Sequence, residues 1–153
     1  MQVENKHMPD AQQLEKLSQP GPQGPIFMIN LVKYKKRAQY EDGRKNDLTG
    51  KQAYRLYGME VIKMLPRYHA AVIFSSHITE IMVGKTEELW DEMTLVKYAS
   101  RADLLAMTTS KEWIAANVHR MAGIEGQLNI ESVSAFPVKA AKEATKPHKN
   151  AEP

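Results

Sequence analysis

The sequence predicts an α+β domain in which four strands form an antiparallel sheet and two main helices cover one of its faces. The chain has 153 residues, 42% of them hydrophobic and 25% charged, which suits one soluble domain with a core. The apolar period changes along the chain in the order strand, helix, strand, strand, helix, strand. Capping residues mark the starts of the helices. Two halves of this kind build one antiparallel sheet with both helices on the same side.

The first 25 residues are predicted to be an extension of the domain. Leu14 and Leu17 share one face of a short helix at residues 9–19. The stretch "QPGPQGP" that follows contains three prolines and two glycines, which interrupt regular structure. Large apolar residues at 26–34, "IFMINLVKY", then predict the first strand.

A polar loop and an amphipathic helix follow the first strand. The loop at 37–50 is long enough to act as a lid or a specificity element. Thr49 is placed to cap a helix at about 50–66, which Pro66 ends. One face of this helix carries Ala53, Tyr54, Tyr57, Val61, Met64 and Leu65.

The second half of the chain supplies three more strands and two helices. The predicted strands lie at 70–83, 90–98 and 127–136, the first with a bend near Ser75. Ser100 caps a short helix, and Ser110 caps a longer one that Gly123 closes. Pro137 ends the last strand.

The predicted organisation is an extension at 1–25, a domain at 26–137 and a lysine-rich, disordered tail at 138–153. The tail lysines lack the aromatic or arginine neighbours of a nucleic-acid site, so no nucleic-acid partner is expected. The absence of cysteine excludes disulfides, thiolate zinc sites and cysteine nucleophiles. No apolar run is long enough for a membrane span and no signal peptide is visible, so a cytoplasmic protein is expected.

Four blocks resemble the longer members of the family called DUF1330: "FMINLVKYKKRAQYEDGR", "LTGKQAYRLYG", "WDEMTLVKYASRADLLAM" and "HRMAG". The resemblance runs from about residue 26 to 132 and implies a ferredoxin-like βαββαβ fold of the dimeric α/β-barrel superfamily. It also implies a small ligand, often aromatic, held between sheet and helices. The sheet face away from the helices would be bare and apolar, so a homodimer formed sheet to sheet is expected.

The haem-degrading branch of that superfamily can be compared with this sequence position by position. Asn30 matches the asparagine of the first strand in those enzymes. Met107 stands where they have a tryptophan, and Asn117 stands at the position of the histidine iron ligand. Because an amide is a poor axial ligand compared with imidazole, no haem is expected. No histidine pair has metal-binding spacing, so neither a metal nor an organic cofactor is predicted.

The candidate site combines amides and phenols from three elements. Alternation places Asn30 with Met28 and Val32 on one face of the first strand. If that face meets the helices, Asn30 converges with Tyr54, Tyr57 and Asn117 on one cavity, where Asn30 and Tyr57 would polarise a carbonyl or stabilise an enolate. Each residue also has a structural alternative, as a core tyrosine or a hydrogen-bonded buried amide.

Three charged or titratable residues complete the set of candidates. His77 in the second strand would suit a general base, although it could also be a half-exposed polar strand residue. His119 points away from the inward stripe of its helix, so it is a weaker candidate for a proton carrier. Arg120 lies on the flank of that stripe, from which it could reach a pocket rim or a carboxylate.

The sequence therefore supports two hypotheses about function. The first is a cofactor-independent enzyme of the oxygenase, isomerase or cyclase type that acts on a hydrophobic, oxygen-bearing small molecule. The alternative is a non-catalytic ligand-binding or stress-response dimer that uses the same cavity. No motif in the chain identifies the substrate.

Overall fold

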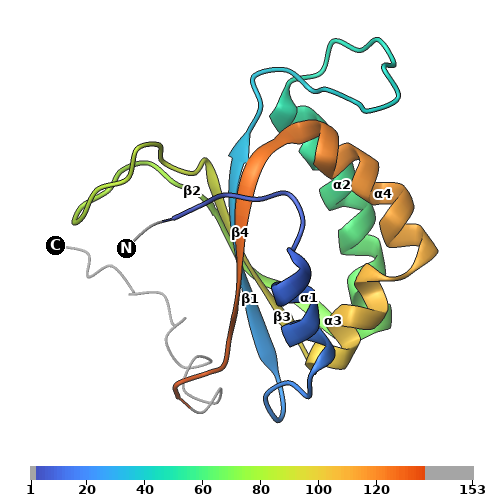
Figure 1. The fold of residues 1–153 in the computed structure, drawn as a ribbon, viewed down its shortest axis with the longest axis vertical. Coiled ribbons are helices and arrows are strands. Elements are labelled where there is room, and N and C mark those ends of the chain that lie inside the picture. The colour runs from blue at the N-terminus through green and yellow to red at the C-terminus, as the bar shows by residue number, and fades with distance from the viewer. Residues whose placement is uncertain (1–2, 137–153) are drawn as a thin grey trace, which may run out of the picture.

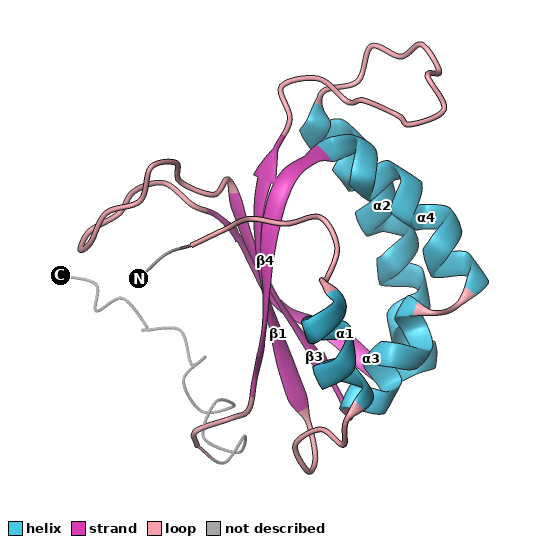
Figure 2. Ribbon diagram, in the orientation of Figure 1, coloured by secondary structure: helices cyan, strands magenta, loops and turns pink. Residues whose placement is uncertain are grey.

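The computed structural model describes residues 3–136 and shows the predicted α+β fold (Figure 2). The strands are β1 (Ile26–Tyr34), β2 (Ala70–His77), β3 (Glu92–Tyr98) and β4 (Ile124–Ser132). The α-helices are α1 (Ala11–Ser18), α2 (Gly50–Met64), α3 (Arg101–Thr108) and α4 (Lys111–Gly123). A 3-10 turn, η1 (Leu65–Tyr68), follows α2 and contains Pro66. The predicted tail at 138–153 lies outside the described residues.

The strands form one antiparallel sheet in the order β2-β3-β1-β4. The long helices α2 and α4 cover one face of the sheet, with α3 beside them (Figure 1). With the element order strand, helix, strand, strand, helix, strand, this is the ferredoxin-like βαββαβ topology. The fold class predicted from the sequence is confirmed. Within residues 3–136, no helix is long and apolar enough to cross a bilayer.

Side-chain caps begin all four α-helices. The side chains of Asp10, Thr49, Ser100 and Ser110 each accept a hydrogen bond from a backbone N–H in the first turn. Thr49 forms a full capping box with Gln52, which bonds back to the Thr49 N–H. The predicted starts at Thr49, Ser100 and Ser110 are thereby confirmed.

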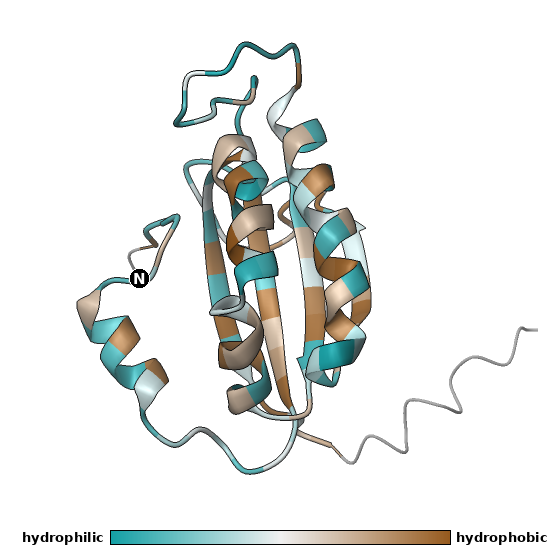
Figure 3. Cartoon of the chain, turned by 90° about the vertical axis from the view of Figure 1, so that its right-hand side faces the viewer, coloured by the Kyte–Doolittle hydropathy of each residue, from teal (hydrophilic) through white to brown (hydrophobic). Residues whose placement is uncertain are grey.

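The main apolar core lies between one half of the sheet and the helices. Its buried residues are Ile26, Met28, Met64, Leu65, Ala70, Val96, Tyr98, Met107 and Ala116. Figure 3 looks onto the helix layer and shows hydrophobic stretches of the strands behind the helices. Each fully buried aliphatic side chain contributes roughly 1.5–3 kcal/mol, so this half of the sheet supplies much of the stability.

Two glycines let α2 and α4 touch where they cross. A Cβ atom on Gly50 would lie 2.2 Å from the Lys35 carbonyl oxygen and 2.4 Å from that of Gly123. A Cβ on Gly123 would lie 2.5 Å from the Gly50 oxygen and 2.8 Å from the Tyr54 nitrogen. As predicted, the helix ends at Gly123, but this glycine does not have the positive φ of a glycine cap, and β4 begins at the next residue, Ile124. Close backbone approach explains the glycine at this position.

The bounds of three strands differ from the sequence expectation. β3 begins at Glu92 and not at residue 90. β2 ends at His77 and not at residue 83, while β4 spans 124–132 and not 127–136. Residues 78–91, here called the arm, project from the sheet on the side away from the helices (Figure 1). At the tip of the arm, Met82 is 87% exposed and Val83 is 94% exposed. No neighbouring strand of the described chain pairs with Met82 and Val83, so their local preference for β structure is not enough to extend β2.

The other face of the sheet carries an apolar row. Antiparallel partners project to the same face, and the register aligns Phe74, Leu95, Ile29 and Ile130 across all four strands. Phe74 and Ile130 are exposed. The row has no covering element among the described residues of this chain.

The N-terminal segment docks along the β4 edge of the sheet. Lys6 and Gln127 exchange two backbone hydrogen bonds, each 3.1 Å long. The Trp90 indole donates to Asn5 Oδ1 at 2.7 Å. Figure 3 shows α1 standing to one side of the two long helices. The segment therefore closes the β4 side of the space between sheet and helices.

Candidate functional site

The helix-facing side of the sheet is polar in the half that lies away from the core. One row across the four strands consists of Ser75, Thr94, Asn30 and Asn129. The next row consists of His77, Glu92, Val32 and Gln127. We call these two rows, together with Tyr34, the polar half. Ser75, His77 and Asn129 in these rows are exposed, Asn30, Thr94 and Glu92 are half-buried, and Gln127 is buried. Because the core half of the same face is apolar, we treat the polar half as the candidate site.

Glu92 connects Tyr34 and His77 at the centre of the polar half. The Tyr34 hydroxyl donates to Glu92 Oε2 at 2.9 Å, and His77 Nδ1 lies 3.6 Å from the same oxygen. The Glu92 side chain is only 18% exposed. Burial, followed by the hydrogen bond and charge of Glu92, raises the pKa of Tyr34, so its hydroxyl stays a proton donor at neutral pH.

The outer nitrogen of His77 faces a cation. Lys51 Nζ lies 3.3 Å from His77 Nε2. Because an ammonium can only donate, this contact favours an unprotonated Nε2 and places the ring proton on Nδ1, toward Glu92. An imidazole in this tautomer can accept a proton at Nε2, and the neighbouring carboxylate stabilises the imidazolium that forms.

Tyr54 and Tyr57 of α2 continue an aromatic row above the polar half. The Tyr34 and Tyr54 ring centroids lie 5.4 Å apart, those of Tyr54 and Tyr57 5.5 Å, and those of Tyr57 and Trp113 6.4 Å. The Trp113 indole donates to the Tyr57 hydroxyl at 3.2 Å. Burial raises the pKa of both Tyr54 and Tyr57. The structure thus brings both predicted phenols to the interior, next to Tyr34.

Arg120 is more enclosed than its predicted position on the flank of α4 suggested. Its side chain is 5% exposed, and Nε donates to Gln127 Oε1 at 3.2 Å. Nη1 donates to Asn117 Oδ1 at 3.0 Å, and Nη2 donates to the His7 carbonyl at 2.7 Å. The guanidinium therefore joins α4, β4 and the N-terminal segment. Asn117 serves here as a partner of Arg120.

Asn30 lies in the polar half, but backbone acceptors already engage its amide. Its Nδ2 donates to the Met28 carbonyl at 3.1 Å and to the Thr94 carbonyl at 3.2 Å. The first bond lies within β1, and the second ties β1 to β3 at the boundary between the apolar and polar halves. In this position the Asn30 side chain stabilises the sheet through its bonds to the two backbone carbonyls.

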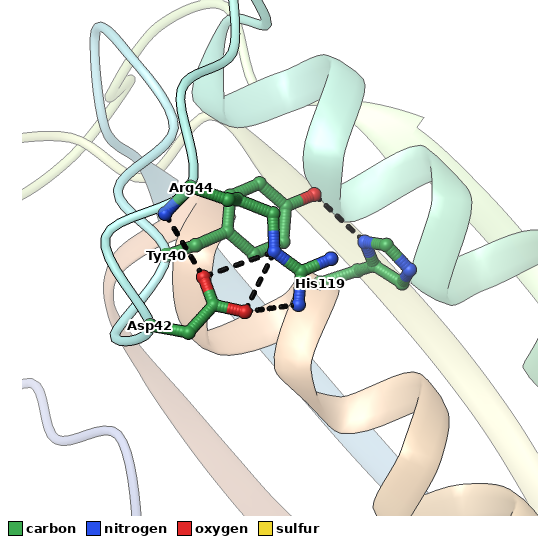
Figure 4. A network of polar contacts seen from close by, with 4 residues as sticks. All are labelled: Tyr40, Asp42, Arg44 and His119. Carbon is green, nitrogen blue, oxygen red and sulfur yellow. Dashed lines mark hydrogen bonds and ion pairs between the residues drawn. The ribbon is translucent and has the colours of Figure 1, made fainter.

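His119 lies apart from the polar half, on the outer surface of α4 (Figure 4). Its Nδ1 is 2.7 Å from the Tyr40 hydroxyl, and the two rings meet edge to face. Arg44 stacks over the Tyr40 ring at 4.6 Å and pairs with Asp42. The predicted lid loop is thereby fastened to the outside of α4. His119 anchors this loop and is not brought together with His77.

Two hollows open on the outside of the helix layer. The first, of about 440 Å³, lies between α2 and α4 and is lined by Glu60, Lys63, Met64, Arg67, Glu112, Ala115, Ala116 and His119. The second, of about 340 Å³, lies under the loop and is lined by Tyr40, Glu41, Asp42, Arg44, Ile114, Asn117, Val118 and Met121. Neither hollow is lined by Asn30, Tyr54 or Tyr57.

Sequence reasoning missed Tyr34, Glu92 and Gln127. Each stands at a period-two position on a strand, where a buried face would normally carry an apolar residue. That irregularity was the available signal, but only the register shows that the three share one face. Within residues 3–136, no cluster of three histidine or carboxylate side chains could hold a metal ion.

Comparison with solved structures supports the fold. No family model and no curated protein matches the chain. A protein of unknown function from Rhodopseudomonas palustris is 26% identical over 88% of this chain and 100% of its own, with a TM-score of 0.79. A methylated form of that protein gives 28% identity, coverage of 88% and 98%, and a TM-score of 0.79. A DABB-family protein with a ferredoxin-like fold from Mesorhizobium loti is 12% identical over 74% of this chain and 100% of its own, with a TM-score of 0.49.

Proposed function

We propose that the chain is a cofactor-independent enzyme of the isomerase or cyclase type, acting on a hydrophobic small molecule with an enolisable carbonyl. The observation that supports this proposal is the half-buried Glu92 carboxylate, which accepts a hydrogen bond from the Tyr34 hydroxyl and lies at ion-pair distance from the His77 ring. A carboxylate beside an imidazole stabilises the protonated form of a general base, and this chemistry needs neither a metal nor an organic cofactor. The sequence blocks quoted above fit a place for the chain in the DUF1330 family.

In the proposed reaction, the Lys51 ammonium moves away from His77 Nε2 as the substrate binds, and this nitrogen removes a proton from the carbon beside the substrate carbonyl. The C–H bonding pair becomes the new C=C bond, and the carbonyl π pair moves onto oxygen to give an enolate. Tyr54, whose hydroxyl has no hydrogen-bond partner among the described residues, donates to that oxygen. In a substrate whose second C=C bond is conjugated with the enolate, return of the proton from His77 to the far carbon of that conjugated system shifts the double bond into conjugation with the re-formed carbonyl. This step completes an isomerisation with no net oxidation.

Glu92 and Tyr34 act through His77 in this scheme. The Glu92 carboxylate, whose Oε2 lies 3.6 Å from His77 Nδ1, stabilises the imidazolium by its charge, while the Tyr34 hydroxyl donates to that oxygen at 2.9 Å and fixes its position. The proposal uses the aromatic row formed by Tyr34, Tyr54 and Tyr57 as the apolar wall against which the substrate lies.

We further propose that the working form is a homodimer. The apolar row of Phe74, Leu95, Ile29 and Ile130 lies on the sheet face away from the helices. A second copy is the natural cover for such a face, because it presents the same apolar row. Two sheets packed in this way would form the closed barrel of the superfamily that the sequence resembles.

The test begins with native mass spectrometry of freshly purified protein, to recover a bound small molecule. That molecule is incubated with the protein in D2O, and deuterium on carbon is followed by NMR. We expect incorporation that His77→Asn slows by about 10²- to 10⁴-fold. His69→Asn is the matched control, because His69 pairs with Asp103 outside the site, and it should exchange at the wild-type rate.

Two outcomes would overturn the proposal. If the molecule returns with no deuterium on carbon, the protein is a binder and the non-catalytic alternative is favoured. If His77→Asn exchanges as fast as the wild type, the reaction does not use the polar half. Light scattering on the same samples reports whether the variants keep the wild-type assembly.

A further inference from the structure

Arg120 carries a buried positive charge whose partners are all uncharged. The three strong acceptors around it are the Gln127 and Asn117 amide oxygens and the His7 carbonyl. The remaining contact, from Nη1 to the Met121 sulfur at 3.5 Å, is also neutral. Among residues 3–136, no carboxylate lies within ion-pair distance of this guanidinium. The positive charge therefore has no counter-charge in the described part of the chain.

Arg101 of the same chain shows the opposite arrangement. Its guanidinium grips Glu131 with two bonds, Nε to Oε2 at 2.8 Å and Nη2 to Oε1 at 2.6 Å. Arg101 is more exposed than Arg120, so water would help to solvate its charge. Arg101, which is more exposed, therefore has a carboxylate partner, whereas the more deeply buried Arg120 has none among the described residues.

The surroundings of Arg120 supply further hydrogen-bond donors. Burial lowers the pKa of Arg120, as expected for a cation that has lost water and gained no anion. Its charge opposes the rise in the pKa of Tyr54 and of Tyr57 that burial causes, so both phenols lie within its field. Every fully buried polar side-chain atom of the described residues has a partner, so the unpaired Tyr54 hydroxyl still borders accessible space.

We propose that Arg120 binds the carboxylate of the small molecule that the proposed function places against the polar half and the aromatic row. The carboxylate would accept from the guanidinium and supply the missing negative charge, which leaves the Tyr54 hydroxyl free to donate to the substrate carbonyl. The inference rests on the proposed function, since it assigns an acid to the same site. It narrows the substrate class to a hydrophobic carboxylic acid, ionised at neutral pH.

The experiment compares benzoate with benzamide, two probes of nearly the same shape that differ in charge. The full-length chain is titrated with each probe, and the chemical shifts of its backbone amides are followed by NMR. We expect saturable binding of benzoate with a Kd on the order of 1 mM, and binding of benzamide that is weaker by about tenfold or more. Arg120→Met should reduce benzoate affinity by a similar factor.

Arg55→Met is the matched control, because it removes the same charge from an exposed position on α2. It should leave benzoate affinity unchanged. If Arg120→Met does not fold, Arg120→Lys keeps the charge but loses the planar fork, and it should still weaken benzoate binding. The fold of each variant is checked by circular dichroism before titration.

The proposal is wrong if the wild type shows no saturable benzoate binding, if benzamide binds equally well, or if both arginine variants bind as the wild type does. Failure of the enzyme hypothesis gives a different pattern. In that case His77→Asn and wild type would be equally inactive, while benzoate binding and its dependence on Arg120 would persist.

Discussion

Replacing Gly50 by alanine should destabilise the fold strongly, because it forces apart the crossing of α2 and α4. The new Cβ would lie 2.2 Å from the Lys35 oxygen and 2.4 Å from the Gly123 oxygen, so each must retreat by about 1 Å to reach ordinary contact. The Lys35 oxygen accepts from Gly50 N at 3.2 Å, and the Gly123 oxygen accepts from Lys35 N at 2.9 Å. Overpacking of about 1–3 kcal/mol and two weakened hydrogen bonds of about 1 kcal/mol each give an expected loss of about 3–5 kcal/mol.

Gly58→Ala is the matched control in the same helix. A Cβ at Gly58 meets nothing within 4 Å, so alanine should stabilise by about 0.5–1 kcal/mol through helix propensity alone. Urea unfolding followed by circular dichroism measures both variants, at one protein concentration because a dimer's stability depends on it. A Gly50→Ala protein within about 1 kcal/mol of wild type would refute the packing argument.

Three further predictions concern an ion pair, an amide and the outer sheet face. The hydrogen bond from Arg101 holds the pKa of Glu131 below its usual range. The pair therefore stabilises the fold fully at pH values above the ordinary glutamate pKa of about 4.3. This stabilisation is lost as the pH falls through the lower pKa that Glu131 has in the folded state. The difference in unfolding free energy between wild type and Glu131→Gln should therefore be constant from about pH 5 to 7 and shrink below about pH 4; a constant difference down to pH 2 would contradict the pairing. Asn30→Leu should cost about 1 kcal/mol in urea unfolding, because it deletes two hydrogen bonds to backbone carbonyls; if stability holds while ligand binding weakens, Asn30 is a site residue. Light scattering should give twice the chain mass of 17.3 kDa, and Phe74→Glu should give the single mass; a monomeric wild type at micromolar concentration would exclude the sheet-to-sheet dimer.

Local signals in the sequence were sufficient for the elements of the fold. Thr49, Ser100 and Ser110 cap their helices through bonds to N–H groups three residues away, so sequence spacing alone reveals them. The role of Gly123 could not be read in this way, because its close neighbour Gly50 is distant in sequence and is brought near only by the crossing of two helices.

The candidate site shows the same limit more sharply. Tyr54 and Tyr57 could be placed in the interior from helix periodicity, since one face of α2 is clearly apolar. The link between Tyr34, Glu92 and His77 depends on the pairing of three strands, and a shift of one residue in any pair would separate them. Helix periodicity placed Arg120 at the flank of α4. The periodicity does not show that the N-terminal segment covers Arg120, which donates to the His7 carbonyl.

The strand order has a consequence for how the chain can be divided. A cut within the arm at 78–91 leaves β1 and β2 in one fragment and β3 and β4 in the other. In the order β2-β3-β1-β4, every pair of neighbours then joins different fragments. Neither fragment can build a single ladder alone, yet the cut falls in an exposed hairpin and removes no core residue. The two fragments are therefore suited to a split reporter, because each should stay unfolded alone and the domain should fold only when both are present. On the ribosome, the sheet likewise cannot close until β4 emerges to pair with β1.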